Sequence, residues 1–294
     1  MNAIECKGLK KSYRTIEALR GLSFTVPEGS ITGLLGPNGA GKTTTLKIIN
    51  GLLTQYKGEV RIFGQPVAPS DFEYRKKIGF VPEEFSLYEY MSGSEIIAFN
   101  GEITGKEGKE IIKKLQSIFN LPLERKIATY SRGMKKLLSL YLALQTNPRL
   151  IILDEPTDGL DPIVRSKFFD FIIDYVSNSG TTVLFSSHII PEVERISDRV
   201  VFIKNGKKIL EESVDTLKEN SALFIVKREN SNAKMPPDLL YNEKDGYFEI
   251  FAIGNVKFVK EKLLLSGFEV VKELPLLFEQ IFVKFMEAYD ESSA

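Results

Sequence analysis

The chain has 294 residues, more than one small domain needs, so a principal domain with an appendage is expected. Its 39 Lys and Arg residues balance 39 Asp and Glu residues, and this zero net charge argues against a strongly basic nucleic-acid-binding surface. Cys6 is the one cysteine, which excludes an intrachain disulfide, and the lack of a signal-peptide pattern or of about 18 consecutive apolar residues predicts neither secretion nor a membrane span.

Short strands are predicted first, at residues 4–9 and 18–26, joined by a polar turn that contains Tyr13. A single tyrosine in a turn is most often an ordinary surface residue, although its ring can also stack on a base. Strands are also predicted at 58–64 and 77–82. Together these segments indicate a mixed, partly antiparallel β subdomain.

A glycine-rich loop at residues 36–43 follows an apolar run and precedes a helical pattern. It reads Gly-Pro-Asn-Gly-Ala-Gly-Lys-Thr and fits G-x-x-x-x-G-K-[ST], whose backbone N–H groups and following helix cradle phosphates. Lys42 can reach the β- and γ-phosphates, and the Thr43 hydroxyl can bind Mg²⁺. The sequence therefore predicts that a polyphosphate is bound by Gly36, Pro37, Asn38, Gly39, Ala40, Gly41, Lys42, Thr43 and Thr44.

The pattern becomes helical over about 85–147, which predicts an inserted helical subdomain. Within it, Ser131 precedes a strongly helical stretch and is placed to be the N-cap of that helix, leaving N–H groups available to an anion. Taken alone, this arrangement indicates only a capped helix.

The segment Leu-Ile-Ile-Leu-Asp-Glu-Pro begins at residue 150 and ends an apolar strand with two carboxylates. Active sites of parallel sheets lie at the carboxyl ends of their strands, so we expect Asp154 beside Mg²⁺ and Glu155 near the γ-phosphate. The next apolar strand, 181–186, runs directly into His188, the only histidine of the chain. A lone histidine is usually structural, but this position favours a γ-phosphate contact.

A hairpin is predicted around Asn205 and Gly206, and the signals then become weaker. We place the boundary of the principal domain at residue 215. Residues 216–294 are predicted to form a small α+β accessory domain, with strands at 223–226, 247–252 and 268–272 and helices at 256–265 and 275–289.

Taken together, residues 2–215 resemble the ATP-binding subunit of ABC transporters. The resemblance depends on the order of the aromatic turn, the phosphate loop, Val-Pro-Glu at 81–83, Tyr-Ser-Arg-Gly-Met at 130–134, Leu-Asp-Glu-Pro-Thr-Asp-Gly-Leu-Asp-Pro at 153–162, and the single histidine. It implies an α/β fold, namely a P-loop NTPase core with an antiparallel β subdomain and an inserted helical subdomain. It also implies an ATPase whose hydrolysis is coupled to transport.

The resemblance also assigns roles to residues. Tyr13 is expected to stack on adenine, while Ser131 and Gly133 are expected to bind the γ-phosphate of ATP held by a second subunit. Asp161 is expected at the subunit interface. The implied catalytic residues are Glu155, His188 and Lys42, and the implied metal ligands are Thr43, Asp154 and Glu83.

Two departures from the family pattern affect these expectations. Glu83 stands where the family commonly has Gln, which places a second carboxylate near Mg²⁺. The signature commonly reads Leu-Ser-Gly-Gly-Gln, whereas here Arg132 replaces the first Gly of the pair and Met134 replaces the final Gln. The Pro-Glu-Glu stretch, the altered signature and the appendage are similar to the exporter-type branch of the family.

The expected partners are an integral-membrane permease and a second ATPase subunit, either an identical copy or a paralogue, with no nucleic acid. The expected location is the cytoplasm, on the inner face of the cell membrane through the permease. One alternative is a soluble ABC-type ATPase that remodels nucleic acid or ribosomes, but such proteins tend to carry tandem cassettes or a long coiled-coil insertion. A phosphate-loop kinase is a further alternative, which the motif around Ser131 and the position of His188 disfavour.

Overall fold

The computed structural model describes residues 1–67, 73–85, 88–229, 233–237, 239–244 and 246–293. They form two compact units, Met1–Glu211 and Glu212–Ala294. Every residue that the sequence assigns to a site lies in the described ranges of the first unit.

The first unit is built on a six-stranded sheet of β3 (Ile31–Leu35), β6 (Ile78–Val81), β7 (Leu150–Asp154), β8 (Thr182–Ser187), β9 (Arg199–Lys204) and β10 (Lys207–Ser213). The strand order is β10-β9-β3-β8-β7-β6. Strands β3, β7 and β8 are buried along their whole length, as expected of apolar strands covered on both faces. Strands β6, β7, β8, β3 and β9 are parallel, so their carboxyl ends meet at one edge, where such sheets bind ligands.

One prediction about this sheet is wrong. The sequence assigns the strand at 77–82 to the partly antiparallel subdomain, but β6 is an edge strand of the six-stranded sheet and runs parallel to β7. Three of its four residues are buried. Such a short apolar strand shows no alternation of polar and apolar positions, so the sequence pattern cannot tell which sheet it joins.

The second sheet of this unit is antiparallel and comprises β1 (Asn2–Tyr13), β2 (Ile16–Pro27), β4 (Lys57–Ile62) and β5 (Gln65–Pro66). Strands β1 and β2 are longer than predicted, because polar residues such as Lys10 and Glu17 continue the pairing beyond the predicted segments. Tyr13 is therefore the last residue of β1, paired with Ile16, and does not lie in the turn itself.

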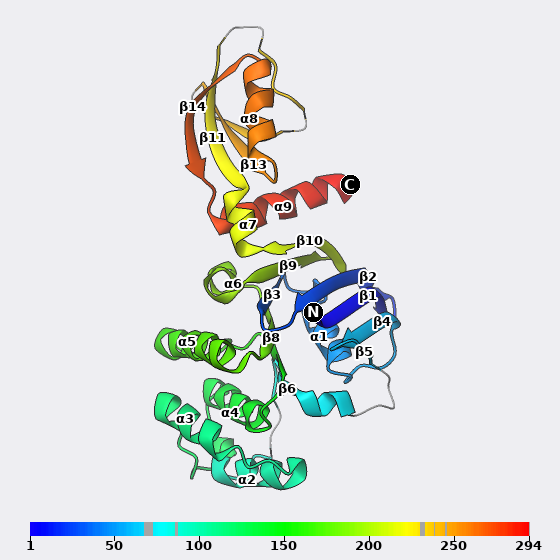
Figure 1. The fold of residues 1–294 in the computed structure, drawn as a ribbon, viewed down its shortest axis with the longest axis vertical. Helices are drawn as coiled ribbons and strands as arrows, with labels where there is room; N and C mark the ends of the chain where they lie inside the picture. The colour runs from blue at the N-terminus through cyan, green and yellow to red at the C-terminus, as the bar shows by residue number, and fades with distance from the viewer. Residues whose placement is uncertain (68–72, 86–87, 230–232, 238, 245, 294) are drawn as a thin grey trace. The chain divides into compact units, whose positions relative to one another are not determined.

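Three helices flank the six-stranded sheet: α1 (Lys42–Ile49), α5 (Pro162–Ser179) and α6 (Ile190–Ile196). Figure 1 shows α1 and the antiparallel sheet on one side of it, with α5 and α6 on the other. A second group comprises α2 (Gly93–Thr104), α3 (Lys109–Phe119) and α4 (Arg132–Gln145), and α4 packs against β6. Short 3₁₀ helices span Glu73–Lys77 and Ile127–Thr129.

The N-terminus of α2 carries a complete capping box. The Ser92 hydroxyl accepts from the Glu95 N–H at 3.1 Å, and the Glu95 carboxylate accepts from the Ser92 N–H at 2.7 Å. Two N–H groups that the helix cannot pair internally are thereby satisfied.

The second unit contains an antiparallel sheet with the order β12-β13-β11-β14, formed by β11 (Ser221–Arg228), β12 (Leu240–Lys244), β13 (Tyr247–Ile253) and β14 (Phe268–Pro275). Its helices are α7 (Val214–Glu219), α8 (Val256–Leu265) and α9 (Phe278–Ser293). Leu263 of α8 packs with Phe224 and Phe268 on one face of the sheet, while Ile281 of α9 packs with Phe251 on the other. The predicted start of the last helix at Pro275 is wrong, because Pro275 still pairs with Ala222 in the sheet.

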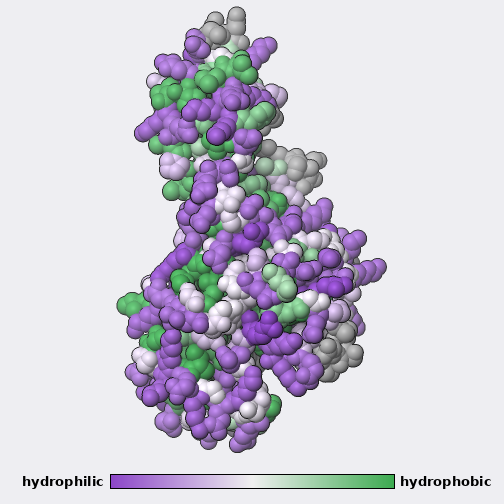
Figure 2. Space-filling model, in the orientation of Figure 1, coloured by the Kyte–Doolittle hydropathy of each residue, from purple (hydrophilic) through white to green (hydrophobic). Residues whose placement is uncertain are grey.

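Polar residues dominate the visible surface of each unit, and apolar residues form smaller patches among them (Figure 2). The mean hydropathy of the chain, −0.08, agrees with this distribution. Across the described ranges, none of the helices combines the length and the apolar sequence that a bilayer crossing requires.

Candidate nucleotide-binding and hydrolysis site

The glycine-rich loop connects β3 to α1 at the carboxyl edge of the sheet. Only glycine fits at Gly36, where a Cβ atom would lie 2.2 Å from the Ile203 carbonyl oxygen. Gly41 has a φ of 106°, and a Cβ atom there would lie 2.7 Å from the Ala18 carbonyl oxygen. The close packing of this loop fixes the start of α1, whose N–H groups and positive dipole end then face the cavity in front of it.

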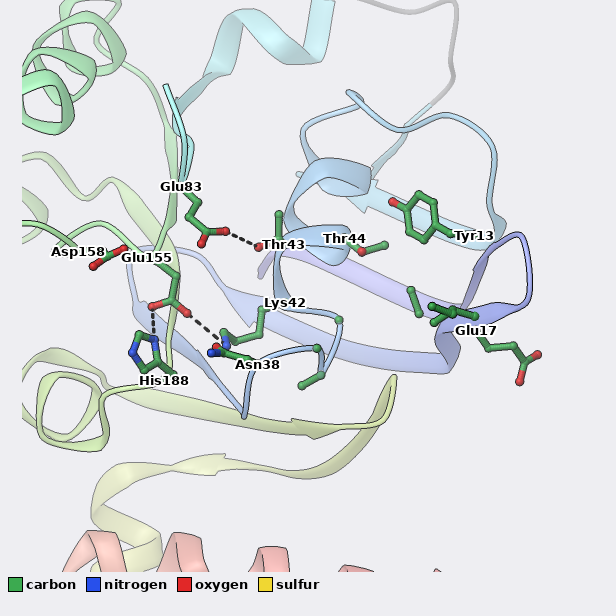
Figure 3. Close-up of a pocket in the computed structure, with 15 residues that line it drawn as sticks. Tyr13, Glu17, Asn38, Lys42, Thr43, Thr44, Glu83, Glu155, Asp158 and His188 are labelled. Atoms are coloured by element: carbon green, nitrogen blue, oxygen red, sulfur yellow. Dashed lines mark hydrogen bonds and ion pairs between the residues drawn. The ribbon is translucent and has the colours of Figure 1, made fainter. Parts of the chain in front are cut away.

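This cavity has a volume of about 610 Å³, a size typical of small-molecule sites. Side chains from both sheets and from the glycine-rich loop surround it (Figure 3). The residues that line it are Tyr13, Ile16, Glu17, Ala18, Asn38, Gly39, Ala40, Gly41, Lys42, Thr43, Thr44, Glu83, Glu155, Asp158 and His188.

Two carboxylates converge on the Thr43 hydroxyl, which lies 3.1 Å from Asp154 Oδ1 and 3.4 Å from Glu83 Oε2. Burial raises the pKa of the Asp154 carboxyl, whereas hydrogen bonds from Ser186 and Thr43 oppose this shift. The second oxygen of Asp154, Oδ2, is buried and finds no hydrogen-bond partner among the described residues. A buried oxygen of this kind, next to a hydroxyl and a further carboxylate, fits a hard cation such as Mg²⁺.

Glu155 lies between Lys42 and His188 (Figure 3). Its Oε1 atom is 3.2 Å from Lys42 Nζ, and its Oε2 atom is 2.9 Å from His188 Nδ1. Glu155 has a φ of 44°, an uncommon conformation for a residue other than glycine, which strained functional sites often contain. Lys42 Nζ also donates to the Gly36 carbonyl at 2.8 Å. The structure therefore brings the three predicted catalytic side chains together at one end of the cavity.

Tyr13 lies at the opposite end of the cavity, on β1 (Figure 3). Tyr13 is 43% exposed as a residue, and Lys11 Nζ lies 5.0 Å from its ring centroid. The ring thus offers an accessible aromatic surface in the same cavity as the glycine-rich loop.

Sequence reasoning missed two buried residues that hold this site in place. The Ser186 hydroxyl on β8 donates to Asp154 Oδ1 at 2.7 Å and accepts from the Glu155 N–H at 2.9 Å. Glu192 on α6 accepts from the Thr157 hydroxyl at 2.8 Å and from the Ser187 hydroxyl at 3.0 Å. Two adjacent serines, Ser186 and Ser187, at the end of an otherwise apolar strand are the sequence feature that could have indicated these supporting hydrogen bonds.

Five predicted ATP-binding residues lie outside the group that lines this cavity: Gly36 and Pro37 at the start of the glycine-rich loop, and Ser131, Gly133 and Asp161. Ser131 caps α4 by accepting from the Met134 N–H at 3.2 Å, and Asp161 caps α5 by accepting from two N–H groups. Arg132 Nη2 lies 2.6 Å from Asp158 Oδ2 and connects the signature segment to a residue of the cavity wall.

The model of the ABC transporter family matches residues 19–158. The daunorubicin/doxorubicin resistance ATP-binding protein of Streptomyces peucetius is 35% identical over 74% of this chain and 67% of its own length. The chain belongs to the family of ABC transporter ATP-binding subunits. The lantibiotic transport ATP-binding protein of Streptococcus pyogenes is 34% identical over 75% of this chain and 95% of its own length.

A solved dimeric ATP-binding cassette in a post-hydrolysis state, bound to ADP and Pi, is 26% identical to this ABC ATPase. It superposes with a TM-score of 0.64 and covers 72% of this chain and 98% of that one. The predicted fold, an ABC-type P-loop NTPase core, is thus confirmed, as is the prediction that the protein is an ATP-binding, ATP-hydrolysing subunit of a transporter.

Proposed function

We propose that this ABC ATPase hydrolyses ATP with Glu155 as the base that accepts a proton from the attacking water. The observation that carries the proposal is the placement of Glu155 between Lys42 and His188 at the phosphate-binding end of the cavity. Lys42 would stabilise the charge that develops on the transferred phosphoryl group, and His188 would contact the γ-phosphate. Tyr13 would stack on adenine at the other end.

We infer that Mg²⁺ accompanies ATP and is held by Thr43, Asp154 and Glu83. The buried, unpartnered Oδ2 of Asp154 supports this inference. Bound Mg²⁺ would neutralise charge on the β- and γ-phosphates. No cluster of three or more acidic, histidine or cysteine side chains that could hold a metal occurs within the described ranges, but Mg²⁺ at phosphates typically needs only one or two carboxylates.

We propose that the complete site forms only in a dimer, either with an identical copy or with a paralogous subunit. Ser131 and Gly133 of one subunit would bind the γ-phosphate in the other, and Asp161 would lie at the interface. Ser131 and Asp161 are exposed and do not line their own chain's cavity, which supports this arrangement.

We propose that the ATPase powers export. The names of the two relatives, which concern drug resistance and lantibiotic transport, support the direction. The partner would be an integral-membrane permease, and the subunit would lie on the cytoplasmic face of the membrane through that contact. Residues 1–215 would form the ATPase domain, with its helical subdomain at about 85–147, and residues 216–294 an accessory domain.

The test of the catalytic assignment is Glu155→Gln. We expect ATP binding to persist while turnover falls at least roughly 100-fold, since an amide cannot accept the proton from water. Hydrolysis would be measured as phosphate release, binding with a fluorescent ATP analogue, and dimer formation by size-exclusion chromatography with ATP.

The matched control is Glu261→Gln, at an exposed glutamate of α8 in the other unit. It makes the same chemical change and should leave turnover unaltered. Wild-type hydrolysis rates in Glu155→Gln would sink the assignment of the base. Co-purification of the chain with a permease encoded by a neighbouring gene, and a change of its ATPase rate on that contact, would test the transport role.

A further inference from the structure

Lys136 is a buried charged side chain to which the proposed mechanism gives no role. It lies on α4, five residues after the N-cap Ser131, and is only 3% exposed. Its Nζ atom donates to the backbone carbonyls of Glu83 at 2.7 Å, Pro82 at 2.8 Å and Asp154 at 3.3 Å. An ammonium group has three protons, so these carbonyls use its complete donor capacity.

The three carbonyls belong to two segments on the metal side of the cavity. Pro82 and Glu83 directly follow β6, and Asp154 is the last residue of β7. The side chains of Glu83 and Asp154 both approach the Thr43 hydroxyl, at 3.4 Å and 3.1 Å. The Lys136 ammonium group therefore binds the backbone of both residues, Glu83 and Asp154, whose carboxylates face this hydroxyl.

Burying the Lys136 ammonium group carries a desolvation cost that packing of the helix alone does not explain. Removing it from water costs free energy, and an apolar side chain of similar length would avoid that cost but would leave the three carbonyls without this donor. Burial lowers the pKa of Lys136 to about 8, so the group is still mainly protonated at pH 7 and keeps its three donors. Because its three hydrogen bonds reach both the segment after β6 and the end of β7, Lys136 joins these two segments and does more than fill space.

We propose that Lys136 is a positioning residue that sets the separation of Glu83 and Asp154 for Mg²⁺ binding. The inference rests on the proposed function, because it assumes that these two carboxylates face the metal. Lys136 and Ser131 share one helix, so a displacement of the signature end of α4 would be transmitted to both carboxylates. Lys136 thus links the surface offered to the partner subunit with the metal side of its own chain's cavity.

The test is Lys136→Met in the full-length chain, since methionine fills similar space but has no donor. The affinity for a fluorescent ATP analogue would be measured against free Mg²⁺, and also in EDTA. We expect the free Mg²⁺ concentration that gives half of the maximal gain in ATP-analogue affinity to rise about tenfold or more. This is the usual loss of metal affinity when an outer-shell partner of a metal site is removed. Affinity in EDTA should stay within about twofold, since the phosphate loop itself is unchanged.

Gln145→Met provides the matched control. Gln145 lies on the same helix, is 2% exposed, and also donates to two backbone carbonyls, those of Ile97 at 2.9 Å and Glu107 at 3.1 Å. Its loss should lower the midpoint of thermal unfolding without moving the Mg²⁺ dependence. Lys136→Gln, whose amide retains two donors, should recover part of the Mg²⁺ affinity.

Each outcome separates this inference from the proposed function. If Lys136→Met folds and keeps the wild-type Mg²⁺ dependence of ATP binding, the inference is overturned while the proposed function stands. The same conclusion follows if Gln145→Met changes the Mg²⁺ dependence as much as Lys136→Met does. If Lys136→Met does not fold, Lys136→Gln decides by showing or lacking an intermediate Mg²⁺ requirement. A wild-type chain whose ATP binding ignores Mg²⁺ would overturn the metal site itself, and the inference with it.

Discussion

The two halves of the composite site differ in how far a single chain assembles them. In the phosphate-loop half, Lys42 and Asp154 are buried, and Glu155 is hydrogen-bonded to its neighbours within the chain. In the signature half, Ser131 and Arg132 are exposed, and the Ser131 hydroxyl caps α4. The first half is held together by contacts within one chain, whereas the second presents exposed residues that, under the proposed function, would act on contact with another subunit.

This difference indicates which half of the site couples the free energy of ATP binding to dimer closure. Because its side chains are already held by contacts within one chain, the phosphate-loop half would order few new side chains when ATP binds, which favours affinity within one chain. The signature half would discriminate between open and closed dimers, because its proposed contacts to phosphate would exist in only one of them. ATP would therefore drive closure through the exposed half rather than the buried one.

Of the substitutions that test this difference between the two halves, Ser131→Ala should have the largest effect, and that effect should be on dimer formation. In a Glu155→Gln background, we expect the dissociation constant of the ATP-bound dimer to rise roughly 100-fold, since each of two sites loses a hydrogen bond to charged phosphate worth about 1.5 kcal/mol. ATP binding by the monomer should stay unchanged. Analytical ultracentrifugation at several concentrations measures the first quantity, and fluorescent ATP titration the second.

Ser92→Ala is the control for this prediction. It removes an N-cap from α2, as Ser131→Ala removes one from α4, and each loss costs about 1 kcal/mol of stability. Only Ser131→Ala should weaken the dimer. Equal weakening by both variants would mean that loosening of the helical subdomain, and not a phosphate contact, is responsible.

Lys42→Ala tests the phosphate-loop half. We expect ATP affinity of the isolated chain to fall roughly 30-fold, because a charge-assisted contact worth about 2 kcal/mol is lost and Glu155 loses its cationic neighbour beside the phosphates. Isothermal titration calorimetry measures the change. Lys47→Ala, on the exposed side of the same helix, should bind ATP normally; similar losses in both variants would contradict the assigned role.

Tyr13→Ala should have a smaller effect, confined to the base. Loss of stacking on one ring costs about 1 kcal/mol, or roughly fivefold in ATP affinity. Binding of inorganic triphosphate should not change, and Tyr13→Phe should bind ATP like the wild type because it keeps the ring. Equal ATP affinity in Tyr13→Ala and the wild type would remove Tyr13 from the site.

The contiguous parts of the site were predictable from the sequence, and its long-range supports were not. The glycine-rich loop and the carboxylates Asp154 and Glu155 each belong to one short segment, whose chemistry can be read locally. The roles of Ser186 and Glu192 depend on which strands are neighbours, since β7 pairs with β8 across 32 residues of chain. The sheet to which β6 belongs was misassigned for the same reason: pairing partners of short strands are set by tertiary packing.

Cys6 provides the smallest and most exacting test of preorganisation. Burial, together with the nearby charge of Glu211, raises the pKa of the Cys6 thiol well above its ordinary range. Because the thiolate is the reactive form, Cys6 should resist a thiol reagent at pH 8 and react only as fast as the first unit opens. If ATP binding needs no rearrangement of this unit, saturating ATP should not speed that reaction. A faster reaction with ATP would show that the buried half also moves, and would remove the contrast between the two halves.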